Sequence, residues 1–379
     1  MRAEGGGDDV RSPRRSRVAV LLASPVGSCH HRHVVGNPWR RRSAAYRRVG
    51  PGRPKRSTRV AAELHRANRR LRRPRSGWSA LRCVLVAYAA GAVAVAVTRK
   101  RSGIPPAVVL AVASVAPLAV AAAMPPGRPR HVATGAAYMW VFQLTWALPY
   151  DDPDRLRERL HVRYPIRADS WLGGGVAPTL RLQRTLRGRH PDRASVLDTA
   201  VVAIYASWFV PHLVLGWVLI RHEEFIPRAA GRLAAAYHLT TPFYWLVPTA
   251  PPWWASESAG ELDGEVRHVL GLVLRKLRPQ PAQDRDVQQS SGNPWGSMPS
   301  DHIASAAITA MALSEINATY GALGWSYVAL ASFSVIYLGE HYLVDVLAGL
   351  AVAEAVQLAE PAFNPLARRV ARSLELVAS

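Results

Sequence analysis

The sequence predicts an all-α integral membrane protein, a polytopic bundle of about six core helices with extra helices before them. The first observation is a series of apolar runs between residues 78 and 358, several of them long enough to cross a bilayer as helices. The second is the distribution of charge. Arg and Lys outnumber Asp and Glu by 48 to 26, but much of this excess lies in the first 77 residues, outside the apolar runs.

Residues 1–77 form a basic segment rich in Arg, Pro, Gly and Ser, with few large hydrophobic side chains. Such a composition cannot bury enough apolar surface to fold, so we expect a disordered cytoplasmic tail that anionic lipid headgroups attract. A nucleic-acid-binding arm is the alternative, but no aromatic interleaving or recognisable fold accompanies the charge, and we expect no nucleic acid partner.

The apolar runs predict seven or eight membrane helices. The expected spans are Trp78 to Val97, Ile104 to Met124, Ala133 to Leu148, Val196 to Ile220, Arg232 to Pro248, Ile303 to Ile316, Gly321 to Leu338 and Leu343 to Leu358. We therefore divide the chain into the tail (1–77), N-terminal membrane helices (78–131), a second membrane domain (132–362), which contains the two stretches described below, and a short basic C-terminal tail (363–379).

A polar interval from Asp151 to Arg193 separates the third run from the fourth. Its early part, Asp152 to Tyr164, alternates in charge as a surface helix does. The Gly173-Gly174-Gly175 run that follows indicates a turn or a close backbone approach.

The first stretch whose residue types could bind an anion or transfer a proton is Gly296-Ser297-Met298-Pro299-Ser300-Asp301-His302. Pro299 stiffens the turn before a helix that we expect to start near His302. The N-terminus of a helix offers unpaired N–H groups and a positive dipole end, which suit a phosphate. Ser297 and Ser300 are candidate donors to that anion. Taken alone, the stretch could also be a variant capping box.

The second stretch is Gly339-Glu340-His341-Tyr342-Leu343-Val344-Asp345. On a helix, His341 and Asp345 share a face at i and i+4 and can hydrogen-bond. A carboxylate on one imidazole nitrogen fixes the tautomer and leaves the other nitrogen free to attack. His302 is then available to protonate a leaving group. An isolated His-x3-Asp is more often structural or a metal ligand, so the joint occurrence of the two stretches carries the catalytic interpretation.

The two stretches resemble the second and third signature motifs of the type 2 phosphatidic acid phosphatase superfamily, PSGH and SRxxxxxHxxxD. The closer similarity is to its inositol phosphorylceramide synthase-like branch, in which SMPSxHxA is paired with GxHYxxDxxAG. Here these read Ser297 to Ala304 and Gly339 to Gly349. The resemblance covers roughly Ile166 to Gly349.

The sequence also departs from the superfamily pattern. The Ser-Arg of the third motif is Ser334-Val335, Asp301 replaces the glycine of PSGH, and no Lys-x6-Arg-Pro motif precedes Pro248. These gaps argue against an ordinary lipid phosphatase and fit the synthase-like branch. They leave open which cation faces the phosphate; Arg267 and Arg278, in the loop before the first stretch, are candidates.

Counting crossings brings the two histidines to one membrane face. If the helix ending at Pro248 exits on that face, His302 begins the next helix there, and two more crossings return the chain to His341. Arginine-rich segments on the opposite side favour a cytoplasmic location for that side. We therefore expect a plasma membrane protein with an extracytoplasmic site.

The sequence thus predicts a metal-independent phosphotransferase that acts on a lipid-linked phosphate through a phosphohistidine. His341 is the expected nucleophile, Asp345 orients it and His302 is the general acid. Ser300, Ser297, Asp301, Arg267 and Arg278 are the expected substrate-binding residues. We expect membrane lipids as partners, a polyol or water as acceptor, and neither metal nor cofactor. The alternatives are a lipid phosphate phosphatase, a histidine–aspartate metal hydrolase, which lacks enough ligands, and a non-catalytic transporter or scaffold.

Overall fold

The computed structural model describes residues 80–187, 193–222, 225–277 and 293–378, and throughout these ranges the regular secondary structure is helical. The chain divides into two units, Met1–Leu71 and Arg72–Ser379, and the described residues all belong to the second. The predicted basic tail lies outside them. The longer helices are α3 (Ala80–Ser102), α4 (Pro106–Ala123), α5 (Arg128–Ala147), α9 (Val196–Ala206), α10 (Phe209–Arg221), α11 (Ile226–Leu246), α14 (Asp301–Ile316), α15 (Ala318–Tyr337) and α16 (Leu343–Ala378).

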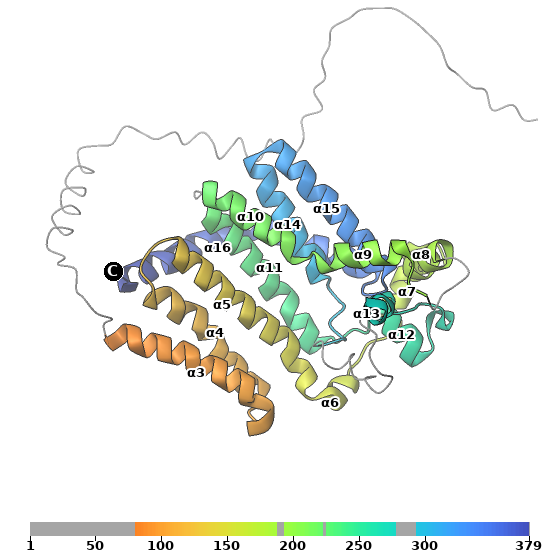
Figure 1. Ribbon diagram of the computed structural model, residues 1–379, viewed down its shortest axis with the longest axis horizontal. Helices are drawn as coiled ribbons and strands as arrows, with labels where there is room; N and C mark the ends of the chain where they lie inside the picture. Colours follow the sequence, from red (N-terminus) through yellow and green to blue (C-terminus); the bar gives the residue numbers. More distant parts are fainter. Residues whose placement is uncertain (1–79, 188–192, 223–224, 278–292, 379) are drawn as a thin grey trace, which may run out of the picture. The chain divides into compact units, whose positions relative to one another are not determined.

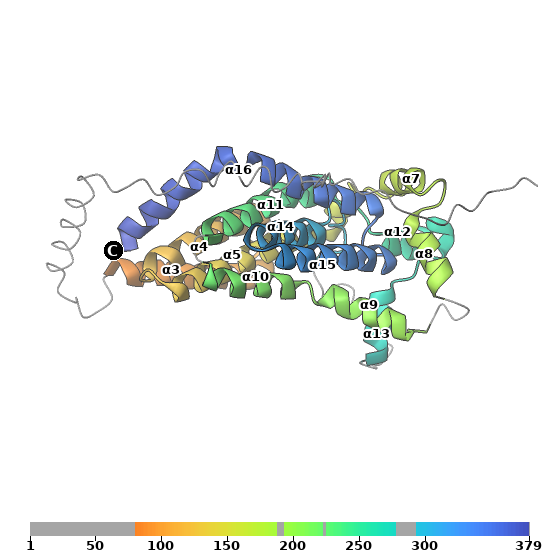
Figure 2. The same ribbon diagram turned by 90° about the horizontal axis from the view of Figure 1, so that it is seen from above.

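Short helices follow the polar intervals of the sequence. They are α6 (Pro153–Arg157), α7 (Arg163–Leu172), α8 (Pro178–Leu186), α12 (Pro252–Ala259) and α13 (Val269–Leu277). Figures 1 and 2 both show α7, α8, α12 and α13 gathered at one end of the longer helices. The predicted surface helix over Asp152–Tyr164 is only the single turn of α6, followed by the start of α7.

The hydrophobic core lies between α11, α14, α15 and α16. Its buried side chains are mostly small or β-branched, such as Ala307, Ala310 and Val335. Small residues let these helices approach closely: a Cβ on Gly324 of α15 would lie 2.8 Å from the Cα of Ala310 in α14. Asn317 joins the two helices and accepts a hydrogen bond from Thr319 N at 2.7 Å, which caps α15.

The first helices form a second group in which α4 packs against both α3 and α5 (Figure 1). Within the described ranges, α3 and α4 are the two helices long and apolar enough to cross a membrane by length and composition. These two helices match the first two predicted spans, whereas the polytopic arrangement of the remaining helices stays a prediction.

The predicted span Val196 to Ile220 was wrong as a single helix. It divides into α9 and α10 at Ser207-Trp208. The hydroxyl of Ser207 bonds to Ile204 O at 2.6 Å and lies 3.1 Å from the hydroxyl of Tyr327 in α15. This break is important for the site because it turns the Trp208 side chain toward the start of α14.

The last helix extends beyond its predicted end at Leu358, and runs through the region that we expected to be a basic tail. It contains Pro361 and Pro365. Each proline lacks an N–H and crowds the preceding turn, which bends a helix. Figure 2 shows that α16 changes direction along its length.

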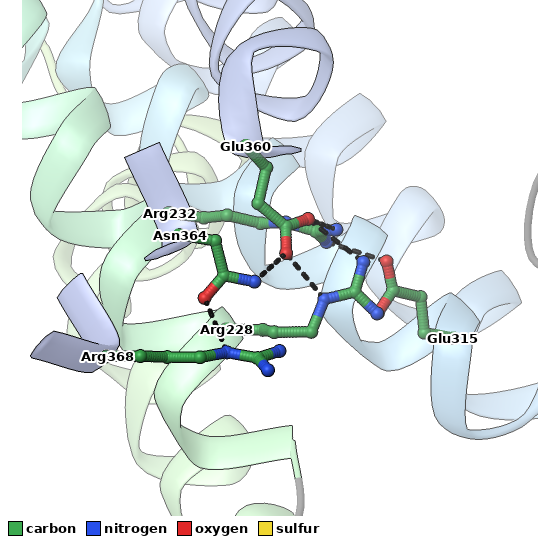
Figure 3. A network of polar contacts seen from close by, with 6 residues as sticks. All are labelled: Arg228, Arg232, Glu315, Glu360, Asn364 and Arg368. Carbon is green, nitrogen blue, oxygen red and sulfur yellow. Dashed lines mark hydrogen bonds and ion pairs between the residues drawn. The ribbon is translucent and has the colours of Figure 1, made fainter. Parts of the chain in front are cut away.

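Far from the short helices, a network of charged side chains ties α11, α14 and α16 together (Figure 3). Arg232 of α11, with a side chain only 1% exposed, contacts Glu360 of α16 and bonds to Glu315 of α14 at 2.7 Å. Arg228 reaches the same two carboxylates at 2.7 and 3.1 Å. Asn364 extends the network by donating to Glu360 at 3.2 Å. Two arginines and two glutamates balance in charge.

Candidate active site

His341 lies in the turn between α15 and α16. The turn depends on Gly339, whose φ of 78° is in the left-handed region. A Cβ there would also come within 3.3 Å of the Cβ of Trp253. After this glycine, the N–H groups of Glu340 and His341 both bond to Val335 O, at 3.0 and 3.1 Å. The turn thus fixes the backbone of His341 before α16 begins.

The imidazole of His341 has a defined tautomer. Its Nδ1 lies 2.8 Å from the backbone oxygen of Ser297. A carbonyl oxygen only accepts hydrogen bonds, so Nδ1 carries the proton and Nε2 keeps its lone pair. The contact with Asp345 is longer, 3.4 Å from Nδ1 to Oδ2. The predicted His341–Asp345 pair therefore exists, but not on one helix face, because α16 starts at Leu343.

Asp345 holds the two stretches against each other. It is fully buried, and its Oδ2 accepts from the hydroxyl of Ser297 and, at 2.9 Å, from Tyr342 N. Its backbone oxygen accepts from Ser300 N at 3.0 Å. Gly349, one turn further along α16, makes this approach possible, since a Cβ there would lie 2.4 Å from Ser300 O.

His302, in the first turn of α14, faces His341. Its Nδ1 lies 3.4 Å from His341 Nε2, and the ring centroids are 5.5 Å apart. The ring of Tyr205 stacks on His302 at 4.9 Å, and Trp208 lies 5.0 Å away. Trp208 is anchored by a 3.1 Å hydrogen bond from Nε1 to Ser305 Oγ. The position of Trp208 against His302 depends on the break between α9 and α10, which the apolar pattern of the sequence does not mark.

The predicted substrate-binding serines and aspartate lie beside the histidine pair. Ser297 donates to Asp345, so in this structure its hydroxyl orients the carboxylate. Ser300 is the N-cap residue of α14 and is fully buried, and its hydroxyl has no hydrogen-bond partner among the described residues. Asp301 accepts from Thr240 of α11 at 3.0 Å. Of the three, Ser300 has the hydroxyl available for a ligand.

Of the two arginines predicted to bind substrate, the structure describes only Arg267. The backbone of Arg267 is held by Gln183 of α8: its N–H donates to Gln183 Oε1 at 2.9 Å, and its oxygen accepts from Gln183 Nε2 at 3.1 Å. The next residue in the chain is His268, whose Nε2 lies 3.2 Å from Glu340 Oε1. Arg278 lies outside the described residues. Substrate binding by either arginine stays a prediction.

Asp169 of α7 is a residue that the sequence did not point to. It is fully buried, and its Oδ1 accepts from Val344 N in the first turn of α16 at 2.9 Å. Burial raises the pKa of Asp169 from 3.8 to about 6, while hydrogen bonds from Val344 and Leu343 oppose the rise and the charge of Asp345 adds to it. The contact spans 175 residues, and no local pattern marks it.

No group of three or more His, Cys, Asp or Glu side chains suited to a metal ion occurs within the described ranges. Independence from metal stays a prediction. What the site presents is an imidazole whose Nε2 has a free lone pair, a second imidazole 3.4 Å from that nitrogen, and a buried carboxylate 3.4 Å from Nδ1 of the first.

The family model described as PAP2 superfamily matches residues 165–359, a range that contains the whole histidine site. No curated protein and no solved structure was found to match the chain.

Proposed function

The chain belongs to the PAP2 superfamily, and on that premise we propose that it is a membrane-embedded phosphotransferase acting on a lipid-linked phosphate through a phosphohistidine. The family makes phosphatase- or phosphotransferase-type chemistry the expected activity. One observation carries the mechanism: His341 Nε2, with Nδ1 committed to Ser297 O, faces His302 at 3.4 Å. A phosphate that displaces this contact would find the lone pair of His341 Nε2 available for attack and the His302 imidazole available as a proton donor.

In the first step the lone pair of His341 Nε2 attacks phosphorus, a P–N bond forms and the P–O bond to the leaving group breaks. The departing oxygen takes the electron pair of that bond and a proton from the imidazolium form of His302, which becomes neutral. Asp345 and the Ser297 carbonyl stabilise the imidazolium that results at His341. The buried hydroxyl of Ser300 and the N-terminus of α14 are placed to stabilise the phosphoryl oxygens.

In the second step an acceptor O–H attacks the phosphohistidine. The P–N bond breaks, its electron pair returns to His341 Nε2, and the acceptor proton passes to His302. An alcohol acceptor, such as a polyol, gives transfer, whereas water gives hydrolysis. The similarity of the two stretches to the synthase-like branch favours transfer. The apolar helices α3 and α4 support a membrane location, and we place the site on the extracytoplasmic face of the plasma membrane.

The test uses purified full-length protein in detergent, radiolabelled lipid phosphates, and assays with and without inositol and with EDTA. We expect turnover that survives EDTA, and a phosphorylated peptide containing His341 after rapid quenching. His341→Ala should abolish both, whereas His131→Ala, at an exposed histidine of α5, should have no effect. Phosphopeptide in His341→Ala, or turnover that is lost to EDTA and restored by a divalent cation, would contradict this mechanism.

The same assay separates the two outcomes of the second step. Inositol-dependent formation of a phosphorylated product, at the expense of free phosphate, would show transfer. Free phosphate at a rate that inositol does not change would show a hydrolase that uses the same histidines.

A further inference from the structure

A cavity that the proposed chemistry does not use has walls attached to both stretches of the histidine site. Its volume is about 490 Å³, which is within the usual range of small-molecule sites. One wall is Trp253, whose N–H donates to Gly339 O at 3.0 Å, in the turn that carries His341. Another is Trp295, two residues before Ser297, whose backbone oxygen contacts His341. We call this space the aromatic cavity.

Aromatic rings form one part of its lining. Trp295 is only 5% exposed and packs with Leu156 and Ala250, which hold it in place. Two half-buried rings meet it edge to face: the centroid of Tyr150 lies 5.2 Å away at an interplanar angle of 79°, and that of Trp254 lies 5.7 Å away at 84°. Because Tyr150 and Trp254 line the cavity and are only half-buried, they supply most of its aromatic surface.

Charged side chains form another part of the lining. Asp154 and Arg157 are exposed residues three positions apart in α6, so they share a face of that helix. Arg157 also acts on the hydroxyl of Tyr150: burial raises the pKa of Tyr150, and the positive charge of Arg157 opposes that rise. The guanidinium is therefore close to the aromatic surface.

The remaining polar groups are held by their neighbours. The carboxylate of Asp151, just before α6, is oriented by Arg99 at 2.6 Å and by Lys100 at 3.4 Å. Ser258 lies one turn after Trp254 in α12, so its hydroxyl is on the same face of the helix as that ring. Asp151, Lys100 and Ser258 all line the cavity.

This combination of side chains suits a sugar. A pyranose ring has C–H groups on its faces, which pack on aromatic side chains, and hydroxyl groups around its edge. Each hydroxyl can donate to a carboxylate and accept from a guanidinium or an ammonium group. The lining offers both, because Lys100 and Arg157 stand beside Asp151 and Asp154. A phosphate or a quaternary ammonium ion would be attracted by one sign of charge and repelled by the other.

We propose that the aromatic cavity is a carbohydrate-binding site, in which a pyranose sugar packs against Tyr150 and Trp254 and its hydroxyl groups bond to Asp154 and Arg157. The sugar is either free in solution or the head group of a glycolipid, since both present the same ring. This binding is separate from the proposed phosphoryl transfer and does not depend on it.

The test measures binding by saturation-transfer NMR on purified full-length protein in phospholipid nanodiscs, because maltoside and glucoside detergents carry sugars themselves. The ligands are the methyl pyranosides of glucose, galactose and mannose, with choline and sulfate as charged comparisons. We expect saturable, millimolar binding of at least one glycoside. The titration is repeated with His341→Ala, in which the same binding is expected, so failure of the proposed phosphoryl transfer leaves this result unaffected.

Two substitutions locate the binding in the cavity. Trp254→Leu should weaken it about tenfold, because it removes an aromatic surface and keeps an apolar side chain. Arg157→Gln, at an exposed position, should weaken it severalfold through the loss of a charged hydrogen-bond donor. The matched controls are Trp171→Leu, at an 81% exposed tryptophan of α7, and Arg155→Gln, at an exposed arginine of α6. Neither control residue lines the cavity, and both variants should bind as the wild type does.

The absence of saturable binding for all three glycosides would overturn the proposal, as would binding that both Trp254→Leu and Arg157→Gln leave unchanged. Binding of choline or sulfate that depends on these residues, with no glycoside bound, would show an ion site in place of a sugar site. A second arm adds to the nanodiscs a glycolipid that carries the preferred sugar. Displacement of the methyl glycoside would assign the cavity to lipid-borne sugars, and no displacement would assign it to free sugars.

Discussion

The two histidines of the site are chemically unequal because their surroundings differ. His341 has a carbonyl oxygen and a carboxylate on its Nδ1 side, and these fix its proton there. His302 has two aromatic rings against it, and its Nδ1 faces the other imidazole. The first arrangement leaves a lone pair on Nε2, which is needed for attack. The second positions the imidazole that, in the proposed mechanism, exchanges a proton with the leaving oxygen.

This difference predicts how the two residues respond to the leaving group. His302→Ala should lower turnover of an alkyl phosphate substrate by about 10²–10⁴-fold, because it removes a general acid. With a nitrophenyl leaving group, whose departure needs little protonation, the deficit should shrink. The deficit of His341→Ala should stay the same with both substrates. Rescue of His341→Ala, and not of His302→Ala, by the better leaving group would reverse the assignment of roles.

Asp169 gives a prediction for pH. Its pKa is about 6 in the folded protein and about 3.9 in an unfolded chain, so the folded state binds the proton more tightly. Stability from this group is complete below about pH 4 and is lost as pH rises through about 6, by about 3 kcal/mol. We expect Asp169→Asn to flatten the pH dependence of thermal unfolding between these limits. Asp154→Asn, at an exposed position of α6, is the control and should leave the wild-type profile intact.

The sequence identified the residues that combine local pattern with chemistry, and missed those defined by distant contacts. His302, His341 and Asp345 stand in recognisable spacings, and the structure brings them together. The hydroxyl of Ser297 was expected on a ligand, but it donates to a carboxylate 48 residues away. The pairing of His268 with Glu340 across 72 positions has no local signal, since each residue alone has the pattern of a solvated loop charge.

At the scale of helices, α14 and α16 approach each other through Gly349. A Cβ at this position would lie 2.4 Å from Ser300 O and 3.2 Å from Ala304 N, and both are backbone atoms that cannot rotate away. We predict that Gly349→Ala separates the starts of the two helices and lengthens the 3.4 Å gap between the histidines. A misplacement of about 1 Å costs on the order of 10²-fold in rate, so turnover should fall by about that factor in protein that remains helical by circular dichroism.

The matched control is Gly91→Ala in α3, where nothing lies within 4 Å of the added Cβ. This change should leave turnover unaltered and stabilise the helix by up to about 1 kcal/mol. Full activity in Gly349→Ala would show that the helices tolerate the separation.

The ends of a helix were predicted to within about two residues where its apolar run is bounded by polar or proline-containing segments. The helices α4 and α14 are examples. The break between α9 and α10 was missed because Ser207-Trp208 contains no proline or glycine, and the apolar pattern continues across it. The extension of α16 was missed for the opposite reason. Pro361 and Pro365 predict a helix end, but contacts that α16 makes with α11 continue it.

At the scale of the whole described unit, the network around Arg232 should determine stability. Without Arg232, the carboxylates of Glu315 and Glu360 share the single charge of Arg228, and one buried negative charge is left uncompensated. Such a charge costs about 3–5 kcal/mol. We predict that Arg232→Met lowers the free energy of unfolding by that amount, measured by denaturation in detergent. Arg232→Met combined with Glu360→Leu should recover much of the loss. Arg163→Met, at a pair whose arginine side chain is 76% exposed, should change stability little. A mild effect of the single Arg232 variant would contradict the buried-pair argument.

The charge network also fixes the orientation of the helices, on which the relative position of His302 and His341 depends. It joins the first turns of α11 and the last turn of α14 to the middle of α16, away from His302 and His341. A small rotation of a helix at the network is therefore a larger displacement at its other end. The helix α14 has 16 residues, so it is about 24 Å long at 1.5 Å per residue. A tilt of about 2.5° at the charged end moves the catalytic end by about 1 Å. Substitutions at Arg228 or Glu315 should thus misalign the histidines, although both residues lie outside the proposed site.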